Sequence, residues 1–173
     1  KMIAEGCKGI ACHMPMIRKN VGWKVNSSDW GLINPETKEL INPYDLVTDE
    51  NIIITDWEIQ DFAVQVVRNY IKDKLGFKIF SSQGNPSVNP SLWFKGEEKD
   101  ECVIVGSAKF GGYMPELPSN IDDIIESVSS VTDRVHFASV CFYHPEQKKN
   151  ENVLPLYRGH GTGMKFSGLS LIN

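Results

Sequence analysis

Apolar and polar residues follow a helical period over residues 56–75, and this is the clearest pattern in the chain. Thr55 and Glu58 have the spacing of a capping box, and Gly76 stands where a left-handed residue commonly ends a helix. The pattern therefore predicts a helix from Asp56 to about Leu75. The apolar residues that recur three and four positions apart, as on one helix face, are Ile59, Phe62, Ala63, Val66, Val67, Tyr70 and Ile71.

Shorter apolar segments follow this helix and are separated by turn-forming residues. They predict strands at residues 77–81, 91–94 and 102–110, and a second amphipathic helix at about 121–130. Residues 135–143 are apolar on both faces, which indicates a central strand that is covered on both sides.

The first 50 residues are rich in turns and carry only short apolar segments. Residues 30–33 and 39–41 flank a turn that contains Asn34-Pro35, and they predict a small β-hairpin. We expect residues 1–50 to form a small β-rich segment packed on the core, and residues 51–173 to form the core domain. The fold class is then α/β or α+β, with a mixed sheet flanked by two helices and a small N-terminal hairpin region.

Two further segments change this picture locally. The charged residues 95–101 are expected in an exposed hairpin loop. Residues 153–172 are expected to form a terminal hairpin that turns at the glycine-rich residues 159–163.

Composition is that of an ordinary globular domain, with 173 residues, 41% hydrophobic and 23% charged. No stretch approaches 18 apolar residues, so a membrane is not an expected partner. The 22 acidic residues outnumber the 18 basic ones, whereas nucleic-acid binding usually needs a basic surface. Nucleic acid is therefore not favoured as a partner. Cys102 and Cys141 lie in apolar segments and are expected to be buried thiols, which favours a cytoplasmic location.

The order of elements over about residues 55–143 resembles the restriction-endonuclease-like fold of the PD-(D/E)xK nuclease superfamily. In that family a carboxylate on the second strand and another on the third strand hold Mg²⁺, a lysine follows two residues later, and a glutamate on the first helix assists. The matching positions here are Pro90-Ser91, then Ser107 and Lys109, then Glu58. The resemblance implies a catalytic site at Glu58, Ser91, Ser107 and Lys109.

This site departs from the family pattern at both strand carboxylates, which are replaced by Ser91 and Ser107. Mg²⁺ is a hard cation that proteins usually hold with one or two carboxylates, and a hydroxyl supplies no compensating charge. The site is therefore expected to be degenerate. The chain is expected to need no cofactor, with Mg²⁺ implied only if nuclease chemistry survives.

Two other groups of residues are candidates for binding. Cys7, Cys12 and His13 could supply three zinc ligands, with a fourth from His136, His144 or His160. The usual close cysteine pair is absent, so ordinary thiols are the alternative. Arg158, Gly159 and Gly161 could form a backbone nest for an anion. The alternative is a glycine-rich turn, since no helix pattern follows.

These observations leave three hypotheses for function. The leading one is a non-catalytic domain that binds another protein, because the charge is acidic and no catalytic motif is intact. The alternative is a metal-dependent phosphodiesterase or nuclease on a restriction-endonuclease-like core, with Glu58 and Lys109 retained. A third is a small-molecule pocket lined by tryptophans between the sheet and the N-terminal β region. The oligomeric state stays open.

Overall fold

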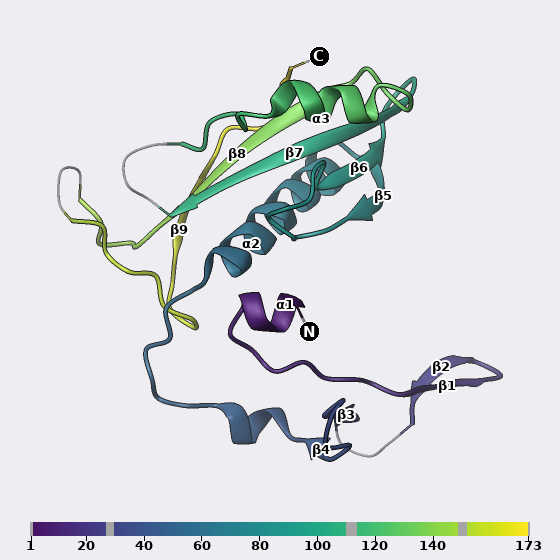
Figure 1. Ribbon diagram of the computed structural model, residues 1–173, viewed down its shortest axis with the longest axis vertical. Helices are drawn as coiled ribbons and strands as arrows, with labels where there is room; N and C mark the ends of the chain where they lie inside the picture. The colour runs from purple at the N-terminus through teal and green to yellow at the C-terminus, as the bar shows by residue number, and fades with distance from the viewer. Residues whose placement is uncertain (1, 27–29, 110–113, 149–151, 173) are drawn as a thin grey trace. The chain divides into compact units, whose positions relative to one another are not determined.

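Figure 1 shows the computed structural model of the chain, which describes residues 2–26, 30–109, 114–148 and 152–172. The chain divides into two compact units, residues 1–51 and residues 52–173. In the part that is described, no helix has both the length and the apolar character required to cross a bilayer.

The first unit is built from short elements: helix α1 (Met2–Gly6), the antiparallel pair β1 (Met16–Lys19) and β2 (Gly22–Val25), the antiparallel pair β3 (Leu32–Ile33) and β4 (Leu40–Ile41), and the 3-10 helix η1 (Pro43–Leu46). The β3–β4 hairpin confirms the hairpin predicted at this position. Its turn is fixed by the Asn34 side chain, which accepts hydrogen bonds from the backbone N–H groups of Glu36 and Thr37 at 2.9 and 3.2 Å. The β1–β2 hairpin was not predicted, because its strands are short, mix apolar and charged residues, and are mostly exposed.

The predicted long helix of the second unit is confirmed as α2 (Asp56–Asn69), which continues as the π-helical turn η2 (Tyr70–Lys74). Both halves of the capping box between Thr55 and Glu58 form, and Gly76 has a φ of 75°. The buried stripe is rotated from the predicted one: Phe62 is 39% exposed, whereas Gln60 is buried. A polar residue therefore occupies a position under the helix, which becomes important for the site.

A six-stranded mixed sheet forms the centre of the second unit. Its strands are β5 (Lys78–Ser82), β6 (Leu92–Lys95), β7 (Asp100–Lys109), β8 (Val135–Tyr143), β9 (Gly163–Phe166) and β10 (Ser170–Leu171). Strands β5, β6 and β7 form an antiparallel meander, and β8 lies parallel to β7 after the crossover through helix α3 (Ile121–Val128). The expected end of the third strand at Phe110 lies outside the described residues.

The sheet is covered by one helix on each face. Helix α2 packs with Val103, Val105 and Val140 in one apolar cluster, and α3 packs with Cys102 and Ile104 in the other. Strand β8 is buried on both faces, as predicted. The mixed α/β class with a mixed sheet is thus confirmed, while the restriction-endonuclease-like assignment stays a prediction.

The predicted terminal hairpin is wrong. Strands β9 and β10 both pair antiparallel with β8 rather than with each other, and Tyr157 forms an isolated bridge with Ile53. The reason is that the apolar strand β8 has an edge left open by β7. Two short strands along that edge satisfy the backbone groups of a long buried strand.

Candidate functional site

Strand β7 presents alternate residues to α2, and these residues change character along the strand. Val103 and Val105 lie in the middle and pack beneath the helix. Because alternate residues of a strand point to the same face, Glu101, Ser107 and Lys109 share this face with the two valines. Glu101 precedes the valines along the strand, and Ser107 and Lys109 follow them. The face therefore has an apolar centre and two polar ends. We call the end at Ser107 and Lys109 the helix-start end, and the end at Glu101 the hairpin end.

At the helix-start end, Glu58 is held by both its helix cap and an arginine from the last part of the chain. The backbone N–H and the hydroxyl of Thr55 donate to Oε2 at 2.9 and 2.8 Å. Arg158 donates from Nε to Oε1 at 2.7 Å and from Nη2 to Oε2 at 3.1 Å. Burial alone would raise the pKa of Glu58, but the hydrogen bonds from Arg158 and Thr55 outweigh it and lower this pKa below the ordinary value.

The position of Arg158 follows from local backbone pairing. The bridge between Ile53 and Tyr157 and the hydrogen bond from Arg158 N to Ile52 O at 2.8 Å place this segment beside the start of α2. The predicted anion nest at Arg158, Gly159 and Gly161 therefore has its cation directed to the Glu58 carboxylate. Gly159 has a φ of 77° and belongs to a turn, after which β9 follows instead of a helix.

Ser107 is connected to α2 through a buried glutamine. Its hydroxyl donates to Gln60 Oε1 at 2.6 Å, and Gln60 Nε2 donates to the carbonyl oxygen of Val105 at 2.9 Å. Gln60 is only 6% exposed, so both ends of its amide need partners inside the protein. Ser107 supplies one of them, which is a sufficient structural role for this hydroxyl.

Lys109 ends β7 and pairs with the first residue of α2. Its Nζ lies 2.8 Å from Asp56 Oδ1, and the Asp56 side chain is 90% exposed. This is an ion pair in contact with water, and such pairs contribute little to stability.

Ser91 differs from the other three predicted residues. It is 1% exposed, and its hydroxyl has no hydrogen-bond partner in the described structure. It lies between the cis peptide bond Asn89–Pro90 and strand β6. Contacts with α2 or its cap thus bring Glu58, Ser107 and Lys109 to one end of the sheet, and no hydrogen bond joins Ser91 to them.

The cysteine candidates give no metal centre within the described residues, since no group of three or more His, Cys, Asp or Glu side chains there has metal-binding geometry. Neither Cys7 nor Cys12 forms a disulfide, and Cys12 is exposed. Burial, assisted by the charge of Glu101, raises the pKa of Cys102 to about 11, and burial also raises the pKa of Cys141. These two buried thiols are therefore unreactive core residues, as expected.

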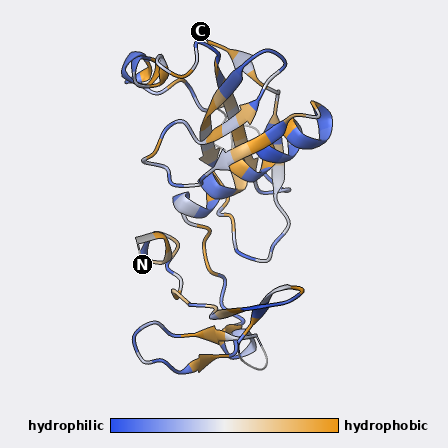
Figure 2. Cartoon of the chain, turned by 90° about the vertical axis from the view of Figure 1, so that its right-hand side faces the viewer, coloured by the Kyte–Doolittle hydropathy of each residue, from blue (hydrophilic) through white to orange (hydrophobic). Residues whose placement is uncertain are grey.

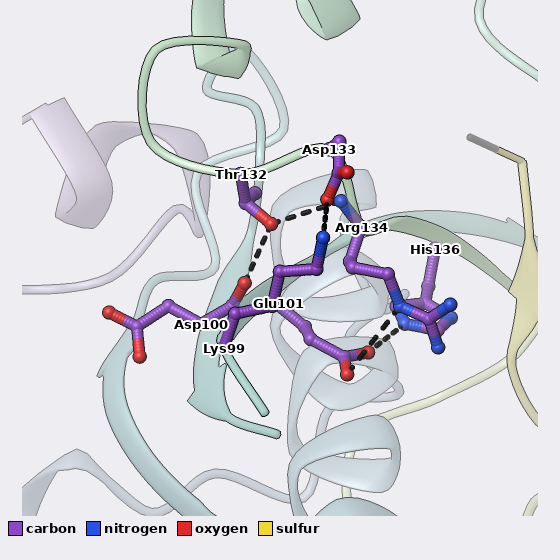
Figure 3. A network of polar contacts seen from close by, with 7 residues as sticks. All are labelled: Lys99, Asp100, Glu101, Thr132, Asp133, Arg134 and His136. Carbon is purple, nitrogen blue, oxygen red and sulfur yellow. Dashed lines mark hydrogen bonds and ion pairs between the residues drawn. The ribbon is translucent and has the colours of Figure 1, made fainter. Parts of the chain in front are cut away.

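The hairpin end holds a polar network that the sequence did not indicate. Figure 3 shows the Glu101 carboxylate directed toward His136 on β8 and toward Arg134 just before it. Glu101 Oε2 contacts His136 Nε2, and Glu101 Oε1 lies 3.7 Å from Arg134 Nε. The expectation that residues 95–101 form an exposed loop is wrong for Glu101, which is 9% exposed in β7. The hairpin loop is shorter than expected, and strand alternation turns this side chain inward.

The loop before β8 is fixed to the start of β7 by further polar contacts. The Thr132 hydroxyl donates to the carbonyl oxygen of Asp100 at 2.6 Å and accepts from the Arg134 backbone N–H at 3.0 Å. Lys99 pairs with Asp133, and its hydrogen bond lowers the pKa of the Asp133 carboxyl. These contacts hold Arg134 and His136 in register with Glu101 (Figure 3).

A cavity of about 860 Å³ opens at this network. Its lining includes charged residues, among them Glu97, Glu98 and Glu101, and aromatic and aliphatic residues, among them Tyr70 and Phe77. The volume lies within the range of small-molecule sites. Its lining contains no tryptophan, unlike the cleft expected between the sheet and the N-terminal region, which stays a prediction.

Gly96 allows Glu101 to lie where it does. A Cβ atom at Gly96 would lie 2.8 Å from Glu101 Cδ and 2.9 Å from Cγ, closer than side chains pack. Any larger residue at this position would displace the Glu101 carboxylate from His136. The short loop between β6 and β7 is thus shaped around this side chain.

The N-terminal unit presents a different kind of surface. Every buried hydrophobic residue of the described structure lies between Ile54 and Leu156, so none belongs to residues 1–51. Val21 is 91% exposed and Trp23 is 65% exposed on the β1–β2 hairpin, and Tyr44 and Val47 are 71% and 74% exposed. In Figure 2 the strands β3 and β4 of this unit are orange, the colour of hydrophobic residues. This unit therefore exposes large apolar side chains without a buried core.

Comparison with known proteins places most of the chain in one family. A family model with the description "Domain of unknown function (DUF8840)" matches residues 57–172. The match begins in the first turn of α2 and ends after β10, so it includes both polar ends of the sheet. No curated protein and no solved structure matches the chain.

Proposed function

Since the chain belongs to this family of domains of unknown function, we propose a function from its own residues: it is a non-catalytic domain that binds another protein. The observation that carries the proposal is the N-terminal unit, whose apolar side chains, Trp23 among them, are exposed and lack a core of their own.

A segment of about this size rarely folds alone without a disulfide, a metal or a partner. None of the four cysteines forms a disulfide, and the described part of the chain has no cluster of metal ligands. Exposed aromatic and aliphatic side chains that gather on one segment are typical of protein interfaces. A protein partner that covers them would supply the apolar burial that residues 1–51 lack.

The charge of this unit supports a protein rather than a nucleic acid as partner. Residues 1–51 contain six Lys and Arg against seven Asp and Glu. Phosphate backbones are bound by an excess of positive charge, which this unit does not have. We assign the protein to the cytoplasm, and four cysteines without a disulfide are compatible with that reducing compartment.

Substitution on the β1–β2 hairpin tests this proposal. Proteins captured from a cell extract by the full chain are purified and titrated against wild type, Trp23→Ser and the control Val131→Ser. Val131 is 62% exposed but lies in the second unit. We expect Trp23→Ser to weaken binding at least tenfold, as aromatic interface residues do, and the control to bind like wild type.

The same variants show whether Trp23 serves the fold instead. We expect Trp23→Ser and Val131→Ser to unfold at the same temperature as wild type, within about 1 °C. A fall of several degrees for Trp23→Ser alone would mean that this side chain packs on residues 52–173. That result, or equal binding by all three proteins, contradicts the proposal.

A metal-dependent phosphodiesterase is the second candidate. It is supported by the helix, three-strand meander, helix and parallel strand order, and by Asp56, Glu58 and Lys109 at one end of that sheet. Against it, Ser91 and Ser107 supply no carboxylate, and Glu58 and Lys109 already have charged partners. The purified chain is incubated with DNA and RNA in Mg²⁺ or Mn²⁺. Cleavage by wild type that Lys109→Ala abolishes would overturn the non-catalytic proposal.

A further inference from the structure

The cavity at the hairpin end carries an excess of negative charge. Of its acidic lining residues, Asp133 is paired with Lys99, and Glu101 contacts Arg134 and His136. Glu97 and Glu98 also line the cavity, and both belong to the short loop between β6 and β7. Neither carboxylate forms an ion pair in the described structure. The charge that a ligand meets there is therefore negative after the internal pairs are formed.

Aromatic residues also line the cavity. Tyr70 and Phe77 are partly exposed, and the ring of Phe77 stacks on the buried ring of Phe94 with centroids 5.5 Å apart. The ring of His136, whose Nε2 contacts Glu101, lies 5.9 Å from that of Phe94. Aromatic faces attract cations and apolar chains alike, because the ring face is electron-rich and its removal from water is favourable.

One ring nitrogen of the buried histidine has no partner among the described residues. His136 lines the cavity and is 9% exposed, and its Nε2 contacts the Glu101 carboxylate. No hydrogen bond to Nδ1 exists within the described residues, so a polar group of a ligand can pair with it.

We propose that this cavity binds a ligand that carries an alkylammonium or guanidinium group on an apolar stem. The cationic head meets Glu97 and Glu98, while the stem lies along Tyr70 and Phe77. This site is separate from the exposed N-terminal residues of the proposed protein interface and goes beyond that function.

The neighbouring cavity shows that the charge is local. A second cavity of about 440 Å³ shares Phe77 with the first, but its charged lining residues are Arg68, Lys72 and Lys78. Both cavities are therefore lined in part by aromatic and aliphatic side chains, but the net charges of their linings are opposite. An organic cation is attracted to the first and repelled from the second, which provides a matched control within one protein.

Calorimetric titration of the full chain tests the proposal with three probes of equal length: hexylammonium, hexanol and hexanoate. We expect hexylammonium to bind more tightly than hexanol by at least fivefold and hexanoate not to bind at the first cavity. The double substitution Glu97→Gln and Glu98→Gln lies on an exposed loop and should weaken hexylammonium about tenfold or more. The control Lys72→Gln, in the second cavity, should leave its affinity unchanged or slightly increased.

Two further probes separate the sources of such a cation. A capped peptide with one lysine is compared with the same peptide carrying norleucine, and both with free hexylammonium. Binding of the lysine peptide assigns the site to a side chain of a polypeptide, whereas binding of hexylammonium alone assigns it to a small amine. If no cationic probe binds at millimolar concentration, or if the Glu97→Gln, Glu98→Gln variant binds like wild type, the proposal is wrong.

Discussion

The two polar ends of the α2-facing side of β7 use similar residues in different ways. At the helix-start end, Glu58 and Ser107 are joined to Arg158 and Gln60 by short hydrogen bonds beneath the helix. At the hairpin end, the buried Glu101 and His136 also contact each other, but they line a cavity of about 860 Å³. One end is closed by partners from the chain, and the other is open to a ligand.

The difference comes from what covers each end. The N-terminal turns of α2 lie over Ser107, so Gln60 and the cap of the helix fill the space there. Near the hairpin end the helix has changed to the π-helical turn of η2, and Tyr70 and Leu75 line a cavity instead of filling it. A resemblance in element order pointed to the closed end. Accessible charged groups and apolar walls lie at the open end.

The largest effect is expected from Glu58→Ala. This substitution removes the capping box and leaves Arg158 without its carboxylate, and the pair is mostly shielded from water. We expect a loss of about 2–3 kcal/mol in the free energy of unfolding, measured by urea denaturation. The exposed Glu116→Ala serves as control and should change stability by less than about 0.5 kcal/mol. A loss no larger than that of the control would show that the helix-start end is not closed by this pair.

The Glu58 carboxylate should also make the free energy of unfolding depend on pH. Because the folded state lowers the pKa of Glu58 below its ordinary value of 4.5, its stabilisation is complete above that pH and is lost as the pH falls toward the lower folded-state value. As the pH is lowered from 5 to below the folded-state pKa of Glu58, the wild type should therefore lose more stability than Glu58→Gln. Parallel pH profiles for the two proteins would contradict the assignment.

Ser107→Ala should have the next largest effect. It leaves Gln60 Oε1 without a donor in a site that is 6% exposed. An unsatisfied buried acceptor costs about 1–2 kcal/mol, which urea denaturation would detect. The double variant Ser107→Ala, Gln60→Leu removes both polar partners and should recover part of the loss. No recovery would mean that Ser107 acts through another contact.

Gly96→Ala tests the open end with a smaller effect. The new methyl group must displace the Glu101 side chain, and its contact with His136 would be lost. We expect a loss of about 1 kcal/mol, because water in the cavity can solvate the displaced carboxylate. Gly161→Ala is a suitable control, since a Cβ there meets nothing within 4 Å. A loss above that of Glu58→Ala would show that the hairpin end is as closed as the other.

Lys109→Ala is expected to have the smallest effect. Its partner Asp56 is exposed to water, so the pair should contribute less than about 0.5 kcal/mol. Thermal unfolding at low and high salt measures it. A loss above about 1 kcal/mol at low salt would place Lys109 inside the closed network and not at its edge.

Much of the fold could be predicted because the signals are local. The capping box at Thr55 and Glu58, the glycine at the end of the helix and the apolar strand β8 each depend on neighbouring residues, and all three are confirmed. The pairing of β9 and β10 with β8 could not be predicted, because it depends on which edge of the sheet is left open.

The site was predicted only in part for a similar reason. Glu101 lies in a charged segment that predicted a loop, but β7 already begins at Asp100, so strand alternation turns Glu101 inward beside His136. Gln60 lies among apolar helix residues, and its buried partner Ser107 is 47 residues away. Alternation counted back from Val103 and Val105 was the one available signal that Glu101 faces the core.

A single NMR titration compares the two ends most directly. The full chain, labelled with ¹⁵N, receives hexylammonium and then Mn²⁺, and the amide signals of Glu101, His136, Glu58 and Lys109 are followed. If the hairpin end is open, the amine should shift the signals of Glu101 and His136. If the helix-start end is closed, Mn²⁺ should not selectively broaden the signals of Glu58 and Lys109. Broadening at Glu58 and Lys109 without any shift at Glu101 and His136 would contradict this assignment of the two ends.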